Sequence, residues 1–335
     1  MRSSFEFLIS SVADGSPQLV LLKKEVNHYR RNALAISTQK TYKSQYDAYM
    51  RFCIKFDFMP VPISQKHLLM YTVFLSRSLK ASSIAGYLNV VRLIHVSLGY
   101  ENPLENNFEL SYLKRGILRE IGSPPKQAMP MTTDMLLKLR AVLDFSKQKD
   151  LTFWGICLTS FYGMLRKSSI LPETLKPKDR NNALLDKDVK FCDDYVVLSF
   201  RHSKTNQFGR KIHKIPYCRN SNQVLCPFRA ILSVKCISEK SQNDLFFSYC
   251  TERIIYNWTG PVFFKSFKSY CAKAGLPYAD LTPHSMRRGG ATLGHLKHLS
   301  PIAIQARGDW ATDCYKKYIH LDDDVMLEAA RLMVS

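Results

Sequence analysis

Apolar residues recur every three or four positions through the first third of the chain, which is the spacing that gives an α-helix one buried face. The clearest case runs from residue 37 to about 56, where Tyr42, Tyr46 and Tyr49 share a face and basic residues point elsewhere. The same spacing predicts further helices over 18–34, 64–79, 82–98 and 108–120. The expected capping residues are Ser37 or Thr38, Ser64 and Ser82.

Residues 122–131 interrupt this helical pattern. They include Pro124, Pro125 and Pro130, and proline both fixes its own backbone and pushes the preceding residue out of a helix. We therefore place a linker at 122–131. The predicted domains are a helical extension at 1–36, a helical domain at 37–121, a second domain at 132–324 and a tail helix at 325–335.

The second domain combines helices with a short β segment. The run LTFWGICLTSFYGML is apolar on nearly all sides, which predicts a buried helix that ends at Arg166. Between 183 and 217, the β-rich runs DYVVLSF and KIHKIPY flank a polar stretch with the Asn and Gly of a hairpin turn. Further helices are predicted over 133–145, 227–240, 261–274, 283–295, 300–306 and 311–319. The pattern predicts a mainly α protein, with an all-α N-terminal domain and an α+β domain that holds a small antiparallel sheet.

The charge of the chain points to a partner. With 335 residues, 46% of them apolar, the chain can bury two cores. It carries 48 Lys and Arg against 28 Asp and Glu, a net charge of +20 that is spread along its whole length. Such a balance favours a polyanion, with nucleic acid as the leading candidate. A basic but solvated surface, or binding to acidic lipid, is the alternative that composition alone leaves open.

Other residue types argue against metals and membranes. The nine cysteines include no C-x-x-C pair and mostly lie in apolar runs, which indicates free thiols in a reducing compartment. His295 and His298 form a close pair, but no Cys or carboxylate completes a zinc site, so we expect no metal and no cofactor. The N-terminus has Glu6 inside its short apolar stretch, which is unlike a signal peptide. No apolar run approaches the roughly 20 residues of a membrane span, and we expect a soluble protein.

Three segments carry chemistry that suits a phosphate group, and the first is centred on Arg166. An unpaired guanidinium at the end of a buried helix is costly unless it faces an anion or an acidic partner. Planar guanidinium groups also match the charge that builds on the non-bridging oxygens of a phosphodiester under attack. A structural salt bridge is the plainer explanation of Arg166 taken alone.

The second segment is the start of a helix in the sequence TPHSMRRGG. Pro283 suits the first turn, and His284 and Arg287, three positions apart, share a face. The amide groups of a helix N-terminus add positive potential, so both side chains are placed to meet one phosphate. The plainer explanation is a capping histidine beside a surface arginine.

The third segment runs from Gly308 to Tyr318 and contains Trp310. It reads as a turn that leads into a helix, which presents Tyr318. A phenol is a poor nucleophile, but arginines and an imidazole nearby favour loss of its proton as it attacks. Tyr315 lies on the same predicted helix face and is the rival nucleophile. Two core tyrosines flanking a Lys-Lys pair are the plainer explanation of this segment alone.

The order of these features resembles one family. An arginine, a lysine in a β-hairpin, H-x-x-R and then G-x-W followed by a tyrosine are similar to the phage-integrase family of tyrosine recombinases, over nearly the whole chain. The N-terminal segment ALAISTQKTYKSQYDAYMRFC resembles the family's core-binding domain, especially in Crypton, Ngaro and DIRS-type mobile elements. The resemblance implies the tyrosine recombinase catalytic fold and puts the catalytic positions on six residues: Arg166, Lys204, His284, Arg287, Trp310 and Tyr318.

The resemblance also implies a mechanism of DNA strand exchange without a metal. Tyr318 would attack the phosphate in line, giving a 3′-phosphotyrosyl link and a free 5′-hydroxyl. Lys204, in the hairpin segment HSKTNQFG, would protonate the departing 5′-oxygen. His284 would assist proton movement, and Trp310 would pack and hydrogen-bond at the phosphate.

The implied partner is double-stranded DNA. Candidate contacts to its backbone are Lys40, Lys43, Lys80 and Arg92 in the first domain and, near the cleavage site, Arg201, Lys211, Arg288 and Lys316. The tail from Val325 to Met333 has an apolar side, and the resemblance docks it on a neighbouring protomer in a homo-tetramer on two DNA sites. Packing of the tail on its own domain is the alternative. The likeness to mobile elements implies a nuclear protein.

Two positions depart from the family's pattern, and two other functions fit much of it. Ser169 stands where members often carry an acidic residue, and the interval from Trp310 to Tyr318 is one residue shorter than in Cre-type members. A type IB topoisomerase would use the same residues to relax supercoils without joining two specific sites. A domesticated, non-catalytic DNA-binding module would need neither Tyr318 nor Lys204, and their retention argues against it.

Overall fold

The computed structural model describes residues 17–122, 127–203, 206, 211–237, 239–320, 327 and 331. The chain forms two compact units, Met1–Lys126 and Gln127–Ser335. The boundary falls inside the proline-rich segment at 122–131. Met129 and Met131 already belong to the second unit, because their backbone N–H groups donate to the carbonyl oxygens of Asp280 and Ser285.

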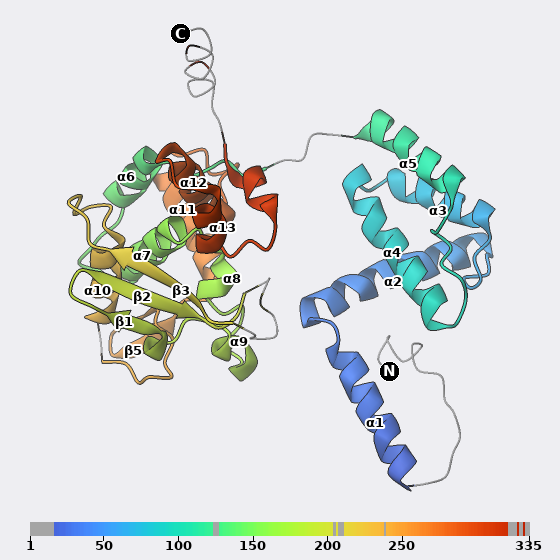
Figure 1. Cartoon of the computed structure of the whole chain (residues 1–335), viewed down its shortest axis with the longest axis horizontal. Helices are drawn as coiled ribbons and strands as arrows, with labels where there is room; N and C mark the ends of the chain where they lie inside the picture. Colours follow the sequence, from blue (N-terminus) through green and yellow to red (C-terminus); the bar gives the residue numbers. More distant parts are fainter. Residues whose placement is uncertain are drawn as a thin grey trace. The chain divides into compact units, whose positions relative to one another are not determined.

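The first unit is built from helices alone over its described residues (Figure 1). Its core lies where α2 packs on α4 and where α3 packs on α4 and α5. Tyr49, Leu68 and Tyr71 are fully buried there. By contrast, α1 buries none of its residues. The helices are α1 (Pro17–Asn32), α2 (Ile36–Phe56), α3 (Gln65–Ser76), α4 (Ala81–Ser97) and α5 (Phe108–Ile121).

Only one of the predicted helix caps in this unit is found in the structure. Ser64 caps α3, as expected, by accepting a hydrogen bond from the N–H of His67. The caps expected at Ser37 or Thr38 and at Ser82 are wrong, because α2 and α4 begin two or three residues earlier, after Ala35 and Lys80, without a side-chain cap. Both helices gain backbone hydrogen bonds by this extension, and a serine or threonine is tolerated inside the first turn.

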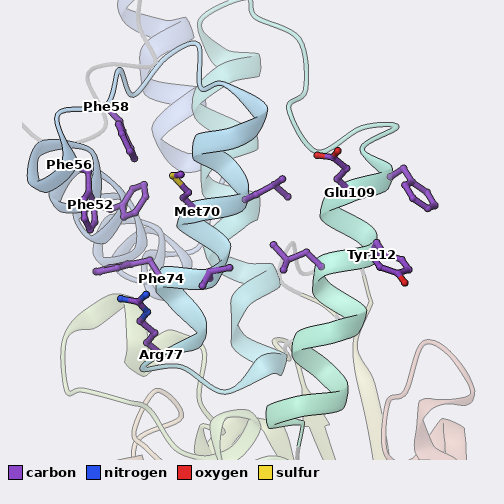
Figure 2. Close-up of a pocket in the computed structure, with 12 residues that line it drawn as sticks. Phe52, Phe56, Phe58, Met70, Phe74, Arg77, Glu109 and Tyr112 are labelled. Carbon is purple, nitrogen blue, oxygen red and sulfur yellow. The ribbon is translucent and has the colours of Figure 1, made fainter.

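An apolar groove of about 590 Å³ opens between α2, α3 and α5. Figure 2 shows its mainly aromatic lining, which includes Phe52, Phe56, Phe58, Phe74 and Tyr112. None of the residues predicted above for chemistry or DNA contact is among the residues that line it.

The second unit surrounds one buried helix, α7 (Gln148–Tyr162), which packs against α10, α12 and β4 (Figure 1). A three-stranded antiparallel sheet has the order β1-β2-β3, and a separate hairpin pairs β4 with β5. The remaining helices are α6 (Thr133–Ala141), α8 (Lys167–Ile170), α9 (Pro177–Asn181), α10 (Pro227–Lys235), α11 (Gly260–Lys273), α12 (Pro283–Leu296) and α13 (Pro301–Arg307). The strands are β1 (Val189–Phe191), β2 (Tyr195–Phe200), β3 (His213–Cys218), β4 (Ser248–Thr251) and β5 (Ile254–Asn257). The predicted division into an all-α part and an α+β part with a small antiparallel sheet is confirmed.

Several predicted bounds in this unit are wrong. Helix α6 ends at Ala141 and not near 145, because Asp144 turns the chain by accepting hydrogen bonds from the N–H and hydroxyl of Ser146. Arg166 does not end α7; it lies four residues beyond, at the start of α8. The segment predicted as a helix over 311–319 is a 3₁₀-helix, Asp313–Tyr318. The predicted tail helix at 325–335 lies outside the described residues, apart from Leu327 and Arg331, which are helical.

Two glycines of α12 let this helix approach neighbouring backbone closely, at Met131 and at Phe161 of α7. A Cβ atom on Gly289 would come within 1.9 Å of the carbonyl oxygen of Met131, and one on Gly290 within 1.9 Å of the carbonyl oxygen of Phe161. Such approaches are open only to glycine. The contact fixes the first turns of α12, with Arg287, beside the end of α7.

The described helices offer no candidate for a membrane span, because none is both long and apolar enough. All nine cysteines are free thiols.

Candidate active site

Helix α12 begins with a reciprocal cap that fixes its first turn. The hydroxyl of Thr282 accepts from the N–H of His284, and the hydroxyl of Ser285 accepts from the N–H of Thr282. Pro283 occupies the first helical position, where its missing N–H costs nothing. The side chain of His284 is exposed and Arg287 is buried one turn further on.

Arg287 is 1% exposed, which is exceptional for a charged residue. Its guanidinium lies 3.7 Å from the ring centre of Trp310 and 5.2 Å from that of Tyr318. One Nη atom donates to the carbonyl oxygen of Met164, whereas Nε and the other Nη meet no acceptor among the described residues. Two donors of a buried cation are therefore available for an anion.

The electrostatics of Arg287 agree with this geometry. Burial, and secondly the charge of Arg166, lower the pKa of Arg287 to about 9, while contact with Tyr318 opposes the shift. The charge of Asp309 also opposes the shift. A guanidinium stays protonated in proteins, so the shift reflects lost hydration and repulsion by Arg166, which a phosphate between the two arginines would offset.

Arg166 reaches this position through a turn at the end of α7. Met164 has a left-handed backbone, with φ of 51°, and the chain reverses there before α8. The Arg166 side chain is half-buried and forms no hydrogen bond to any described residue. The N–H of Ser169, which stands at the usual acidic position, donates to the Arg166 carbonyl, and the Ser169 side chain is buried.

Tyr318 lies among the other candidates. Its ring centre is 5.0 Å from that of His284 and 5.1 Å from that of Trp310. Trp310 is 4% exposed, and its indole N–H has no partner among the described residues. Gly308 makes room for this indole, because a Cβ there would come within 1.8 Å of the ring. The site therefore joins a phenol, an imidazole and an indole around Arg287.

The rival Tyr315 has a different environment. It is 4% exposed and belongs to a small apolar cluster with Met164, Ala291, Ile304 and Trp310. Tyr318 is only partly buried and faces the charged groups. The geometry therefore favours Tyr318 over Tyr315 as the nucleophile.

Lys204 lies outside the described residues. Its preceding neighbour, Ser203, donates from its hydroxyl to Asp309, 2.6 Å away, and Lys211 beyond the hairpin loop pairs with the same carboxylate at 2.7 Å. Sequence reasoning missed Asp309, because its two partners are about a hundred positions away and no local pattern marks them.

The eight predicted DNA contacts fall into different environments. Lys40, Lys43 and Lys80 are exposed, and the guanidinium of Arg92 donates to Asn89. Arg201, Lys211 and Lys316 pair with carboxylates, namely Asp188, Asp309 and Asp313.

Arg288 is buried and its guanidinium is held by main-chain acceptors, so its assignment as a DNA contact stays a prediction. The side chain is 6% exposed, and its guanidinium donates to the carbonyl oxygens of Ala128 and Tyr318. Burial lowers the pKa of Arg288, and Tyr318 opposes the shift. Its bond to the Tyr318 carbonyl holds the backbone of the candidate nucleophile against α12.

No group of His, Cys, Asp and Glu side chains in the described part of the chain is arranged to hold a metal ion.

Comparison with known proteins identifies the fold. No protein-family model and no curated protein matches the chain. The XerH site-specific recombinase, in a post-cleavage complex with a palindromic difH substrate, matches with a TM-score of 0.62 and 15% identity, covering 93% of this chain and 84% of that one. The Tn1549 transposon integrase in complex with transposon right end DNA matches with a TM-score of 0.60 and 16% identity, covering 93% of this chain and 98% of that one. The lambda integrase dimer bound to a COC′ core site matches with a TM-score of 0.53 and 16% identity, covering 90% of this chain and 95% of that one. The chain thus has the fold of the tyrosine recombinases and integrases.

Proposed function

We propose that this protein cuts and rejoins double-stranded DNA through a covalent bond between Tyr318 and a 3′-phosphate. The observation that carries the proposal is the buried guanidinium of Arg287, which has two donors without a protein acceptor and lies 5.2 Å from the ring of Tyr318. A nearby second cation, Arg166, makes the same place attractive to a phosphate.

Each side chain of the site has a role in this reaction. Arg166 and Arg287 hold the non-bridging oxygens as negative charge builds on them, and the indole N–H of Trp310 donates to one of these oxygens. The Tyr318 oxygen attacks phosphorus in line and passes its proton to His284. The bond to the 5′-oxygen breaks, and Lys204 gives that oxygen a proton. Attack by a 5′-hydroxyl on the phosphotyrosine reverses these steps and rejoins the strand.

The domains then divide the work. We assign the helical unit at 37–121 to DNA binding as a core-binding domain, after an extension at 1–36, and the unit at 132–324 to catalysis. The net charge of +20 and the exposed Lys40, Lys43 and Lys80 support contact with a polyanion.

Joining two duplexes requires four strand cleavages, and each uses one tyrosine. A homo-tetramer on two DNA sites supplies four, and we propose this assembly, linked by the tail at 325–335. The resemblance to Crypton, Ngaro and DIRS-type recombinases supports a mobile-element origin and a nuclear location.

A trapping assay tests the chemistry. The substrate is a pool of nicked duplexes with randomised cores, from which the short strand released by cleavage diffuses away and leaves the protein attached. We expect a covalent adduct with the unaltered protein and with Tyr315→Phe, and none with Tyr318→Phe. Loss of the adduct in Tyr315→Phe alone would overturn the assignment of the nucleophile. A recombinase should join the selected substrates in pairs and leave supercoiled plasmid unrelaxed. A type IB topoisomerase should relax the plasmid and join no pairs.

A further inference from the structure

Asp309 connects two segments of the second unit that are distant in sequence. One carboxylate oxygen accepts from the hydroxyl of Ser203, 2.6 Å away, and the other pairs with the ammonium of Lys211 at 2.7 Å. Ser203 and Lys211 lie on either side of the loop that joins β2 to β3. Asp309 itself directly precedes Trp310. One buried carboxylate therefore holds both ends of the hairpin loop against the turn before Tyr318.

Other bonds make this connection rigid. The side chain of Asn206 donates to the carbonyl oxygens of Arg201, at 2.9 Å, and Lys211, at 2.6 Å. The backbone N–H of Asn206 donates to the Ser203 hydroxyl, at 3.1 Å. Asn206 thus closes the base of the loop, and Asp309 attaches that base to the next segment.

A second connection lies beside the first. The Nε2 atom of His213, at the start of β3, is 3.1 Å from the carbonyl oxygen of Arg307. The Arg307 guanidinium donates to the carbonyl oxygens of Tyr162 and Pro216, at 2.6 and 3.0 Å. The end of α13 is therefore held on both α7 and β3, and Asp309 lies two residues beyond it.

The residue type at 309 is costly for the fold. Its backbone is left-handed, with φ of 52°, a conformation in which glycine has no steric penalty. Its carboxylate is 6% exposed, so it has lost most of its hydration. Glycine would serve the backbone better, and therefore the bonds of the carboxylate account for aspartate here.

We infer that Asp309 is a positioning residue, which sets Ser203 and Lys211 relative to the turn that carries Trp310. The inference rests on the proposed function. Lys204 follows Ser203 directly in the sequence, so the step that depends on the Asp309 bonds is proton transfer to the departing 5′-oxygen. Asp309 acts on this step through Ser203 and Lys211, and its charge also interacts with Arg287.

A sulfur-containing substrate tests this role. DNA in which sulfur replaces the bridging 5′-oxygen of the scissile phosphate releases a thiolate, which leaves without a proton. We expect Asp309→Gly, which suits the backbone, to slow cleavage of ordinary DNA about tenfold or more, as weakened general-acid catalysis does. With the sulfur substrate the variant should cleave within a few-fold of the unaltered protein. Lys204→Ala is the reference for a lost proton donor.

Two controls separate the outcomes. Trp310→Ala should slow both substrates, because the indole acts on the non-bridging oxygens and not on the leaving group. If Asp309→Gly slows both substrates equally while its melting temperature is unchanged, or cleaves ordinary DNA at the normal rate, the inference is overturned. If the unaltered protein forms no adduct with either substrate, the proposed function itself fails.

Discussion

The two units of this protein bury different kinds of side chain. In the described part of the first unit, the buried polar residues are Thr72 and His95, and the rest of the core is apolar, with Tyr49, Phe52 and Tyr71 among mainly aliphatic side chains. The second unit has an apolar core of its own, but its described residues include six buried charged side chains: Asp150, Asp186, Asp188, Arg287, Arg288 and Asp309.

This difference distinguishes side chains that stabilise the fold from side chains that could take part in a reaction. Aromatic packing stabilises a fold at little electrostatic cost, whereas a buried charge is unfavourable unless a partner balances it. Most buried charges of the second unit have such partners: Asp186 pairs with Lys235, and Asp188 with Arg201. Arg287 has donors left over, and it is the residue beside Tyr318. The candidate active site is therefore the place where a buried charged group keeps hydrogen-bond donors without a protein acceptor.

The largest effect is expected from the aromatic core of the first unit. Phe52 is 2% exposed and packs against Phe56, Phe58, Tyr71 and Phe74. Phe52→Ala should lower the free energy of unfolding of this unit by about 3–5 kcal/mol, because it removes buried surface and leaves a cavity. Denaturant unfolding of the full chain measures the change.

The matched control is Ile54 on the same helix, which is 76% exposed. Ile54→Ala should change the free energy of unfolding by less than about 0.5 kcal/mol. Equal effects of the two substitutions would mean that the aromatic cluster does not stabilise the unit.

The second prediction concerns the uncompensated charge. Arg287→Met keeps much of the side-chain volume and removes the cation, so it should slow DNA cleavage by about 10²–10³-fold. The melting temperature without DNA should change little, because loss of the buried charge offsets loss of the single hydrogen bond to the Met164 carbonyl. Single-turnover adduct formation and thermal unfolding measure the two quantities.

Arg288→Met is the contrasting variant. Its guanidinium already donates to Ala128 and Tyr318, so its loss leaves two carbonyl oxygens without a donor and should lower the melting temperature. A fall in melting temperature for Arg287→Met as large as for Arg288→Met would contradict the distinction between the two arginines.

The sequence predicted elements best where periodicity is strong. The helices of the first unit were found because their apolar faces repeat at helical spacing, and α7 was found because its run is apolar on nearly all sides. The β4–β5 hairpin was missed, because its turn residues Glu252 and Arg253 take φ of 53° and 64° without the glycine or asparagine that announces such a turn. Tertiary packing imposes that turn, and a local pattern does not reveal it.

The candidate site was predictable to the extent that its chemistry is local. His284 and Arg287 share one helix turn, and Trp310 and Tyr318 one short segment. The bond from Ser203 to Asp309 spans 106 positions and joins two ordinary polar residues. Neither residue type nor spacing distinguishes them from solvated side chains, so only the folded chain identifies this part of the site.

A smaller effect is expected from the buried histidine of the first unit. The Nε2 atom of His95 accepts from the N–H of Ile63 at 2.8 Å, and burial lowers the pKa of His95 from its ordinary 6.5. Protonation removes this acceptor, so the stabilisation is complete above pH 6.5 and is lost as the pH falls from there towards the lowered pKa. His95→Gln should make the free energy of unfolding less dependent on pH in this window.

His213 of the second unit sharpens the comparison. Burial lowers its pKa too, but its Nε2 faces the Arg307 carbonyl, so it donates this bond and keeps it when protonated. His213→Gln should therefore reduce the pH dependence less than His95→Gln. The reverse order would show that the hydrogen bond to Ile63 is not what couples the first unit to pH.

The smallest effect belongs to the exposed basic face of α2. Lys40 and Lys43 are three positions apart and exposed, so they can contact successive backbone phosphates without contributing to the core. Each substitution to Gln should weaken DNA binding a few-fold and reduce the slope of log affinity against log salt by about 1. Lys147, whose charge Asp144 already balances at 3.0 Å, is the control, and Lys147→Gln should leave the slope unchanged. An unchanged slope in Lys43→Gln would mean that α2 does not contact the DNA backbone, because the loss of a phosphate contact lowers the number of counterions released on binding.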